Sequence, residues 1–242
     1  MFSAGWRKGL FYDLQPTSTI NPNNRNYNLE MQLGSLYSYL LFQDRFKVDE
    51  ETWEVMFTQK WFPFTYLDDD LLKQIINHAK NKWNVDELLP KIVENIKKLI
   101  NESDPLSVNK PQLDEHLDIF KRAQERYLDD DFISCASILY PRLEGLMRSI
   151  YRNKEQSKSP SSKILAQTTI EHRQETRTPH SLLLPKKFRA YLDIVYFASF
   201  SPGSDPDVGR HSVAHGEARS DDFSQKSSTI GLLILYQLIL FL

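Results

Sequence analysis

The sequence of 242 residues is poor in glycine and nearly devoid of cysteine: it contains eight glycines and a single cysteine, Cys135. Glycine is the usual residue of phosphate-cradling loops and of tight turns between strands. Its scarcity therefore argues against a nucleotide fold built on such loops and against an all-β fold. A lone thiol excludes a disulfide framework and a multi-cysteine zinc site. It is typical of a reducing compartment, and we expect a cytoplasmic protein.

A long hydrophobic run is also missing. The most apolar stretch, residues 230–242, has 13 residues and is interrupted by Gln237, whereas a membrane-spanning helix needs about 20. We therefore expect a final helix that is buried on most sides, and no membrane anchor. At the other end, Arg7 and Lys8 lie within the apolar stretch of residues 1–12, which does not fit a secretory signal.

Neither sign of charge predominates, because the chain has 30 Lys and Arg residues and 32 Asp and Glu residues. A net charge of −2 provides no global positive field that would attract nucleic acid. The distribution is nevertheless uneven. From Arg148 to Arg189 there are ten basic residues and three acidic ones, so that this stretch carries +7 and the rest of the chain −9. It is either a solvated loop or a rim that attracts phosphate.

What the sequence does have is helical spacing along nearly its whole length. Apolar residues recur every three or four positions in residues 71–79 and 85–100, for example. Aspartate triplets at 68–70 and 129–131 precede two such stretches, where carboxylates would satisfy the free N–H groups of a helix start. Only residues 60–67 resemble a strand, and a proline weakens that interpretation. The expected fold class is all-α.

Residues 101–111 (NESDPLSVNKP) form the clearest interruption, since they are polar and contain two prolines. We place a domain boundary there. It separates a mostly helical N-terminal region of unknown role, residues 1–104, from a C-terminal helical domain, residues 112–242. In the second region we expect helices at about 112–128, 132–152, 186–200 and 221–242, and a long loop with at most one short helix at 154–185.

The most informative stretch is residues 207–216 (DVGRHSVAHG), which contains two of the six histidines. His211 and His215 are four positions apart, so that in a helix they share a face. Arg210 is offset from that face, but its long side chain can reach back toward it. Gly216 would then end or bend the helix beside the second histidine.

This cluster combines a permanent cation, which can bind phosphate through two N–H groups, with imidazoles that titrate near neutral pH. Those are the parts of a metal-free RNA cleavage site. A base removes the proton of a ribose 2′-OH, the oxygen attacks the adjacent phosphorus, and a cation stabilises the charged transition state. Base and acid must lie on opposite sides of the phosphate, and a two-fold dimer would supply both by presenting the motif twice.

Three other interpretations stay open from the residues alone. A His-x-x-x-His pair can bind zinc, but no Glu follows His211 as in metalloproteases, and Cys135 is the only thiol that could assist. We therefore expect no metal and no cofactor. The cluster could also be a structural polar network near a helix end. Finally, it could bind phosphate without catalysing a reaction.

The segment resembles the signature of the HEPN family (higher eukaryote and prokaryote nucleotide-binding domains). In that family four to six residues separate an Arg, usually followed by Asn, Asp or His, from a His. Arg210, His211 and His215 fit this pattern. The helix around Leu143-Glu144-Gly145-Leu146 is similar to a helix of these domains, and so is the apolar helix that closes the chain. The resemblance covers about residues 112–242.

The resemblance implies an all-α bundle that usually dimerises, with paired motifs lining a cleft between the subunits. Active members are metal-independent endoribonucleases, often toxins or defence effectors, whereas others have lost activity and act as binding modules. By this resemblance Arg210 would orient the phosphate, His215 would act as base or acid, and His211 would support the site.

Glu144 is a supporting candidate, because a carboxylate in an apolar helix needs a partner. An ion pair with Arg210 would fix the guanidinium, and a pair with Arg142 or Arg148, or contact with solvent, is the alternative. The basic stretch adds four tentative RNA-binding residues, which are Arg148, Arg152, Lys186 and Lys187.

We therefore expect a homodimeric endoribonuclease that acts on single-stranded or looped RNA, where a 2′-OH can align with the phosphate. An antitoxin or another regulatory partner would fit a toxin. The alternative is a non-catalytic HEPN module that binds a nucleotide, RNA or a protein partner.

Overall fold

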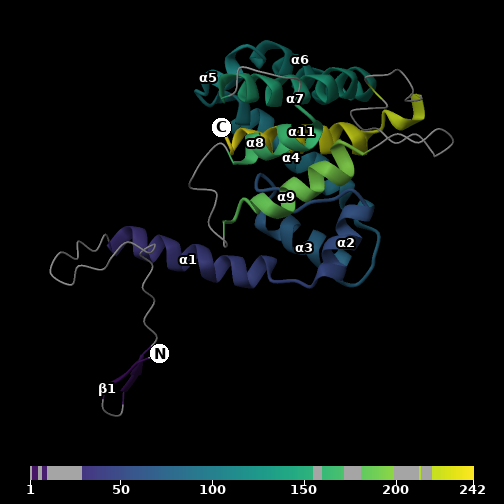
Figure 1. Ribbon diagram of the computed structural model, residues 1–242. Coiled ribbons are helices and arrows are strands. Elements are labelled where there is room, and N and C mark those ends of the chain that lie inside the picture. Colours follow the sequence, from purple (N-terminus) through teal and green to yellow (C-terminus); the bar gives the residue numbers. More distant parts are fainter. Residues whose placement is uncertain are drawn as a thin grey trace. The chain divides into compact units, whose positions relative to one another are not determined.

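The computed structural model describes residues 2–4, 7–9, 29–154, 160–171, 181–198, 213 and 220–242. Contacts divide the chain into two compact units, Met1–Lys47 and Val48–Leu242. The first unit holds a short antiparallel hairpin of β1 (Phe2–Ala4) and β2 (Arg7–Gly9), in which Phe2 pairs with Gly9, and the helix α1 (Leu29–Phe46) (Figure 1).

The second unit is built from helices, which confirms the expected all-α fold. They are α2 (Glu50–Thr58), α3 (Asp69–Lys80), η1 (Val85–Leu88), α4 (Leu89–Ser103), η2 (Pro105–Ser107), α5 (Pro111–Asp114), α6 (Leu117–Leu128), α7 (Phe132–Lys154), α8 (Ser162–Ile170), α9 (Pro185–Tyr191), the π-helical turn η4 (Leu192–Tyr196), η5 (Ser220–Asp222) and α11 (Gln225–Ile239). The strand-like residues 60–67 form no strand. They connect α2 to α3, and Trp61, Phe62 and Phe64 are all buried there, so that the alternation of buried and exposed positions typical of a strand is absent from them.

The final helix, α11, is the centre of this unit. Every residue from Ser227 to Ile239 is buried, as expected for the apolar end of the sequence. It packs against α7 and α4, between which it lies in Figure 1. Gln237, which interrupts the apolar run, accepts a hydrogen bond from the Thr65 N–H at 3.0 Å and donates one to the Leu183 carbonyl at 3.3 Å. Within the described residues, no helix combines the length and apolar character that crossing a membrane requires.

The expected domain boundary at residues 101–111 lies inside the second unit, and the contacts divide the chain after Lys47 instead. The polar stretch is held to the core by hydrogen bonds. The Asp104 carboxylate accepts from the Leu106 N–H at 2.9 Å and from the Gln124 side chain at 2.7 Å. Gln124 also donates to the Tyr236 hydroxyl at 2.9 Å. Residues 101–111 therefore have the composition of a linker, but hydrogen bonds hold them to α6 and α11.

The two aspartate triplets lie at helix starts, but their residues have different roles. Asp131 caps α7, because its carboxylate accepts a hydrogen bond from the Ser134 N–H at 3.1 Å. Asp68 makes no such bond at α3, where Asp69 and Asp70 contribute their charge to the first turn instead. Elsewhere, α8 is a short helix in the described part of residues 154–185, and the helix expected at 186–200 runs from 185 to 196 with a π-helical end.

Among the described residues, three helices end in a left-handed residue that is not glycine. These residues are Lys60, Lys82 and Asp130, with φ of 63°, 58° and 59°. In each case the next N–H bonds to the carbonyl five residues back, at 2.8, 2.8 and 2.9 Å, which is the Schellman arrangement. Glycine normally occupies this position because it has no Cβ to clash. The glycine-poor sequence thus forms these helix ends at a cost in backbone strain.

We expect Lys82→Gly to raise the free energy of unfolding by about 0.5–1 kcal/mol, because it removes the left-handed strain and loses only an exposed ion pair with Glu51. Urea unfolding measures the change. The control is Lys80→Gly in the last turn of α3, which should lower the free energy of unfolding by about 1 kcal/mol. A loss of stability in both variants would contradict the strain at Lys82.

His116 connects the short helix α5 to α7 through a defined tautomer. Arg142 Nη1 donates to His116 Nδ1 at 3.4 Å, which leaves the ring proton on Nε2. The Nε2–H then donates to the Ser149 hydroxyl at 3.0 Å, and that hydroxyl donates to the Gly145 carbonyl at 3.1 Å. The ring is buried, and burial together with the charge of Arg142 lowers the pKa of His116 below 6.5. Neutral His116 is therefore part of the native packing.

Stability should therefore fall as the pH decreases through the window below 6.5. The unfolded chain binds a proton at His116 before the folded chain does, so protonation favours unfolding, with a limiting slope of about 1.4 kcal/mol per pH unit. Urea unfolding at several pH values between 7.5 and 5.5 measures this slope. His116→Gln should reduce it, and an unchanged slope in this variant would assign the pH dependence to other groups.

Candidate functional site

A network of polar side chains surrounds the start of α11. Ser224 precedes this helix and caps it: its hydroxyl accepts a hydrogen bond from the Ser227 N–H at 3.2 Å, and the Ser227 hydroxyl donates to the Ser224 carbonyl at 2.8 Å. The remaining amides of the first turn have no acceptor within the helix, and the helix dipole adds partial positive charge there. The start of α11 therefore favours negative charge.

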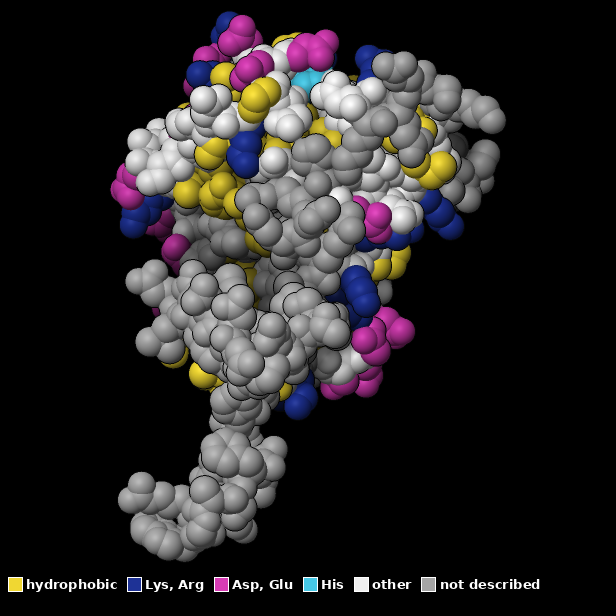
Figure 2. Space-filling model, turned by 60° about the vertical axis from the view of Figure 1, so that its left-hand side comes forward, with side chains coloured by type: hydrophobic (Ala, Val, Ile, Leu, Met, Phe, Trp, Pro, Cys, Tyr) yellow, Lys and Arg dark blue, Asp and Glu magenta, His cyan; other side chains and the backbone are white. Residues whose placement is uncertain are grey.

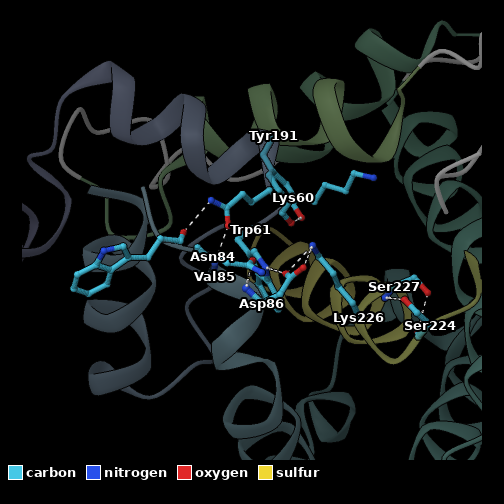
Figure 3. A network of polar contacts seen from close by, with 11 residues as sticks. Lys60, Trp61, Asn84, Val85, Asp86, Tyr191, Ser224, Lys226 and Ser227 are labelled. Carbon is cyan, nitrogen blue, oxygen red and sulfur yellow. Dashed lines mark hydrogen bonds and ion pairs between the residues drawn. The ribbon is translucent and has the colours of Figure 1, made fainter. Parts of the chain in front are cut away.

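Lys226, in the first turn of α11, reaches a carboxylate from a distant part of the chain. Its Nζ lies 2.7 Å from Oδ1 and 2.9 Å from Oδ2 of Asp86, a residue of η1 (Figure 3). Trp61 Nε1 donates to the same Oδ1 at 2.7 Å, and the ring of Trp61 lies 5.8 Å from the Lys226 Nζ. The Asn84 side chain fixes Asp86 in turn by accepting its N–H at 3.0 Å.

Lys60 brings a second ammonium group to this region. The Tyr191 hydroxyl donates to the Lys60 carbonyl at 2.8 Å and so holds its backbone against α9. Partial burial lowers the pKa of Lys60, and the charge of Lys226 lowers it further, while Asp222 and Asp86 oppose the shift. The two ammonium groups therefore repel one another, with carboxylates nearby that compensate in part.

Both lysines line a cavity of about 120 Å³ that is partly open to solvent. The cavity lies between the connection after α2, helix α7, the turn η4 and the start of α11. Other residues on its wall that bear on its chemistry are Thr58, Tyr140, Val195, Asp222 and Ser224. It combines two cations, hydroxyl groups and one carboxylate among its described lining residues. Such a lining can bind an anionic group.

The three expected catalytic residues, Arg210, His211 and His215, lie outside the described residues. Between 199 and 219 the structure describes only Val213, which has helical conformation. On one side of this segment the described chain ends at residue 198, just after η4, and on the other it resumes in η5. Val195 of η4 and Asp222 of η5 both line the cavity. The two described segments that flank the motif in sequence therefore meet at the start of α11.

Glu144 pairs with a residue of its own helix. The Arg148 Nε donates to Glu144 Oε1 at 2.7 Å, and Arg148 Nη2 lies 2.6 Å from the same oxygen. Glu144 is buried and the side chain of Arg148 is one-third exposed. The pair with Arg148 was one of the alternatives left open by the sequence, and it links one turn of α7 to the next. A pair between Glu144 and Arg210 falls outside the described residues.

The four tentative RNA-binding residues fall into two groups. Arg148 is engaged with Glu144, and the Lys187 Nζ pairs with Glu50 and lies 5.1 Å from the ring centre of Trp53. Arg152 and Lys186 are exposed. On the face shown in Figure 2, dark blue basic and magenta acidic side chains are intermixed. This surface does not present one continuous basic patch among the described residues.

The described residues contain no group of three or more His, Cys, Asp or Glu side chains arranged to hold a metal ion. Cys135 is buried, and burial raises the pKa of its thiol to about 12, which makes it a poor nucleophile. Sequence reasoning missed Lys60, Asp86 and Lys226. Asp86 and Lys226 are 140 positions apart, and each occurs in a polar stretch without a recognisable motif.

Comparison with known proteins adds no relative. No protein-family model matches the chain, and neither a curated protein nor a solved structure matches it.

Asp86 should stabilise the site chiefly through the buried Trp61. Asp86→Ala leaves the indole N–H of this fully buried side chain without its acceptor, and we expect the free energy of unfolding to fall by about 2–3 kcal/mol. Asp86→Asn keeps an acceptor for Trp61, but removes the charge facing Lys226 and replaces its second acceptor oxygen by an NH2 group, so it should cost less than Asp86→Ala. Urea unfolding compares the two variants. Equal losses would mean that the ion pair, and not the indole hydrogen bond, carries the effect.

Proposed function

We propose that this chain is a metal-independent endoribonuclease of HEPN type. The observation that carries the proposal is the sequence Arg210-His211-Ser-Val-Ala-His215-Gly216, which resembles the catalytic signature of that family. The all-α fold supports it, and so does the packing of α7, which contains Leu143-Glu144-Gly145-Leu146, against the buried closing helix α11.

The surroundings of the motif in the chain add physical support. The motif segment begins after η4 and ends before η5, and both flanking elements line the cavity that contains Lys60 and Lys226. A polyanionic substrate that reaches this part of the molecule would meet two ammonium groups and the positive end of α11.

The proposed reaction is an internal transfer at phosphorus. His215 of one subunit removes the proton from a ribose 2′-OH, and the 2′-oxygen forms a bond to the adjacent phosphorus. The bond from phosphorus to the 5′-oxygen breaks, and that oxygen takes a proton from the second histidine, which a dimer supplies. Arg210 stabilises the charge on the phosphoryl oxygens. The products carry 2′,3′-cyclic phosphate and 5′-hydroxyl ends, and His211 shapes the site.

Single-stranded or looped RNA is the proposed substrate, because its 2′-oxygen can align with the scissile bond. The proposal includes a cytoplasmic homodimer that acts as a toxin or defence effector under the control of an antitoxin or another regulatory partner. Arg152 and Lys186 are the exposed members of the tentative RNA-binding set.

The test is incubation of the purified protein with mixed-sequence RNA in EDTA. We expect cleavage by the wild type with cyclic phosphate ends, and a rate at least 100-fold lower for His215→Ala or Arg210→Ala, in line with the loss of a general acid–base or charge-stabilising group. The control is His78→Ala on α3, which should cleave normally. Circular dichroism shows whether each variant is folded.

Retained cleavage in both motif variants would refute the assignment of the site. RNA binding by the wild type without products, with or without added metal ions, would favour the non-catalytic module instead.

A further inference from the structure

We propose that the cavity at the start of α11 is a binding site for a phosphate group, held between Lys60 and Lys226. Every residue on which the inference rests belongs to the described part of the chain. The inference goes beyond RNA cleavage, because phosphate binding in this cavity does not depend on whether the protein cleaves RNA.

The first reason is the convergence of positive charge from independent sources. Lys60 comes from the connection after α2 and Lys226 from α11, so the tertiary fold, and not a local cluster in the sequence, brings them to one cavity. Each ammonium raises the energy of the other. The first-turn amides of α11, a helix of 15 residues, add the positive end of its dipole. An anion between these groups relieves their repulsion.

The second reason is the distribution of the carboxylates. Both oxygens of Asp86 are used by Lys226, and one of them also accepts the indole N–H of Trp61. Asp86 thus positions the Lys226 ammonium and is absent from the described lining of the cavity. Asp222 is the one carboxylate among the described lining residues, and it faces two lysines there. Among the described lining residues, lysines therefore outnumber carboxylates by two to one, and Asp86 compensates one of the two lysines from outside this lining.

The third reason is size and polarity. A volume of about 120 Å³ is several times the space that one water molecule needs. It suits a tetrahedral group of five heavy atoms and is small for a whole nucleotide. Hydroxyl groups of Thr58 and Ser224 on the wall can donate to phosphate oxygens.

The primary test measures protection of Lys60 in the unmodified wild-type chain. A lysine acylating reagent is applied with increasing inorganic phosphate, at constant ionic strength made up with chloride, and modified lysines are quantified by mass spectrometry. We expect acylation of Lys60 to fall at least fivefold with saturating phosphate. Lys82 is the internal control, because it has the same left-handed conformation before a tryptophan but an exposed side chain, and its acylation should not change. Equal acylation of Lys60 with and without phosphate would overturn the proposal.

The second test compares matched variants by calorimetric titration with inorganic phosphate. Lys60→Gln should weaken binding at least tenfold, whereas Lys82→Gln should bind as the wild type does. Glutamine keeps a side chain on the left-handed backbone at both positions, so neither variant relieves the strain there. Unchanged affinity in Lys60→Gln would overturn the proposal.

Two further arms identify the source of the phosphate. They repeat the protection experiment on the His215→Ala variant with a nucleoside 5′-monophosphate and with a short single-stranded RNA in EDTA. Protection of Lys60 by RNA at lower concentration assigns the site to the RNA backbone, and stronger protection by the mononucleotide assigns it to a small effector. Absence of cleavage by the wild type, together with intact phosphate binding, would refute the ribonuclease and leave the site in place.

Discussion

The fold depends on the burial of α11 from Ser227 to Ile239, a stretch whose polar side chains have little access to water. Removing a polar group from water costs free energy unless it finds a partner inside the protein. The Thr229 hydroxyl pairs with the Tyr127 hydroxyl at 2.8 Å, and the Ser228 hydroxyl donates to the Phe132 carbonyl at 2.9 Å. Gln237 bonds to backbone groups on two further segments. Apolar packing tolerates exchange among similar side chains, whereas these directed bonds specify one rotation and one register of the helix.

The position of the candidate site follows from that register. The Tyr140 hydroxyl donates to the Ser227 carbonyl at 3.0 Å, and the Tyr196 hydroxyl donates to the Tyr140 carbonyl at 2.6 Å. These bonds hold the first turn of α11 to α7 and η4. Lys226 is thereby placed within reach of Asp86, and the cavity forms where these elements meet the connection after α2. The hydrogen bonds that hold α11 in the core therefore also position the side chains of the candidate site.

Features with a local physical cause could be predicted from the sequence, and features with a long-range cause could not. Helical spacing predicted the elements, an aspartate before a helix predicted the cap at Asp131, and an apolar end with one glutamine predicted the buried final helix. Residues 101–111 lie within the second unit, although their composition resembles that of a linker. The decisive contacts, from Asp104 to Gln124 and on to Tyr236, join residues 20 and 112 positions apart.

The same distinction applies to the two proposed sites, which are the cavity at the start of α11 and the histidine motif. Lys60 and Lys82 each follow a helix in the left-handed conformation and precede a tryptophan. Trp61 is nevertheless fully buried and donates a hydrogen bond to Asp86, whereas Trp83 is half exposed. The lysine-tryptophan pair alone does not distinguish the two lysines, although Lys60 precedes the apolar residues 61–64 and Lys82 does not. Arg210 and His215, in contrast, can be recognised from sequence because five positions separate them. The proposed phosphate site follows from tertiary contacts and the motif from local sequence, so the two are independent lines of argument for an anionic ligand. Since η4 and η5 flank the motif and line the cavity, chain connectivity relates the two.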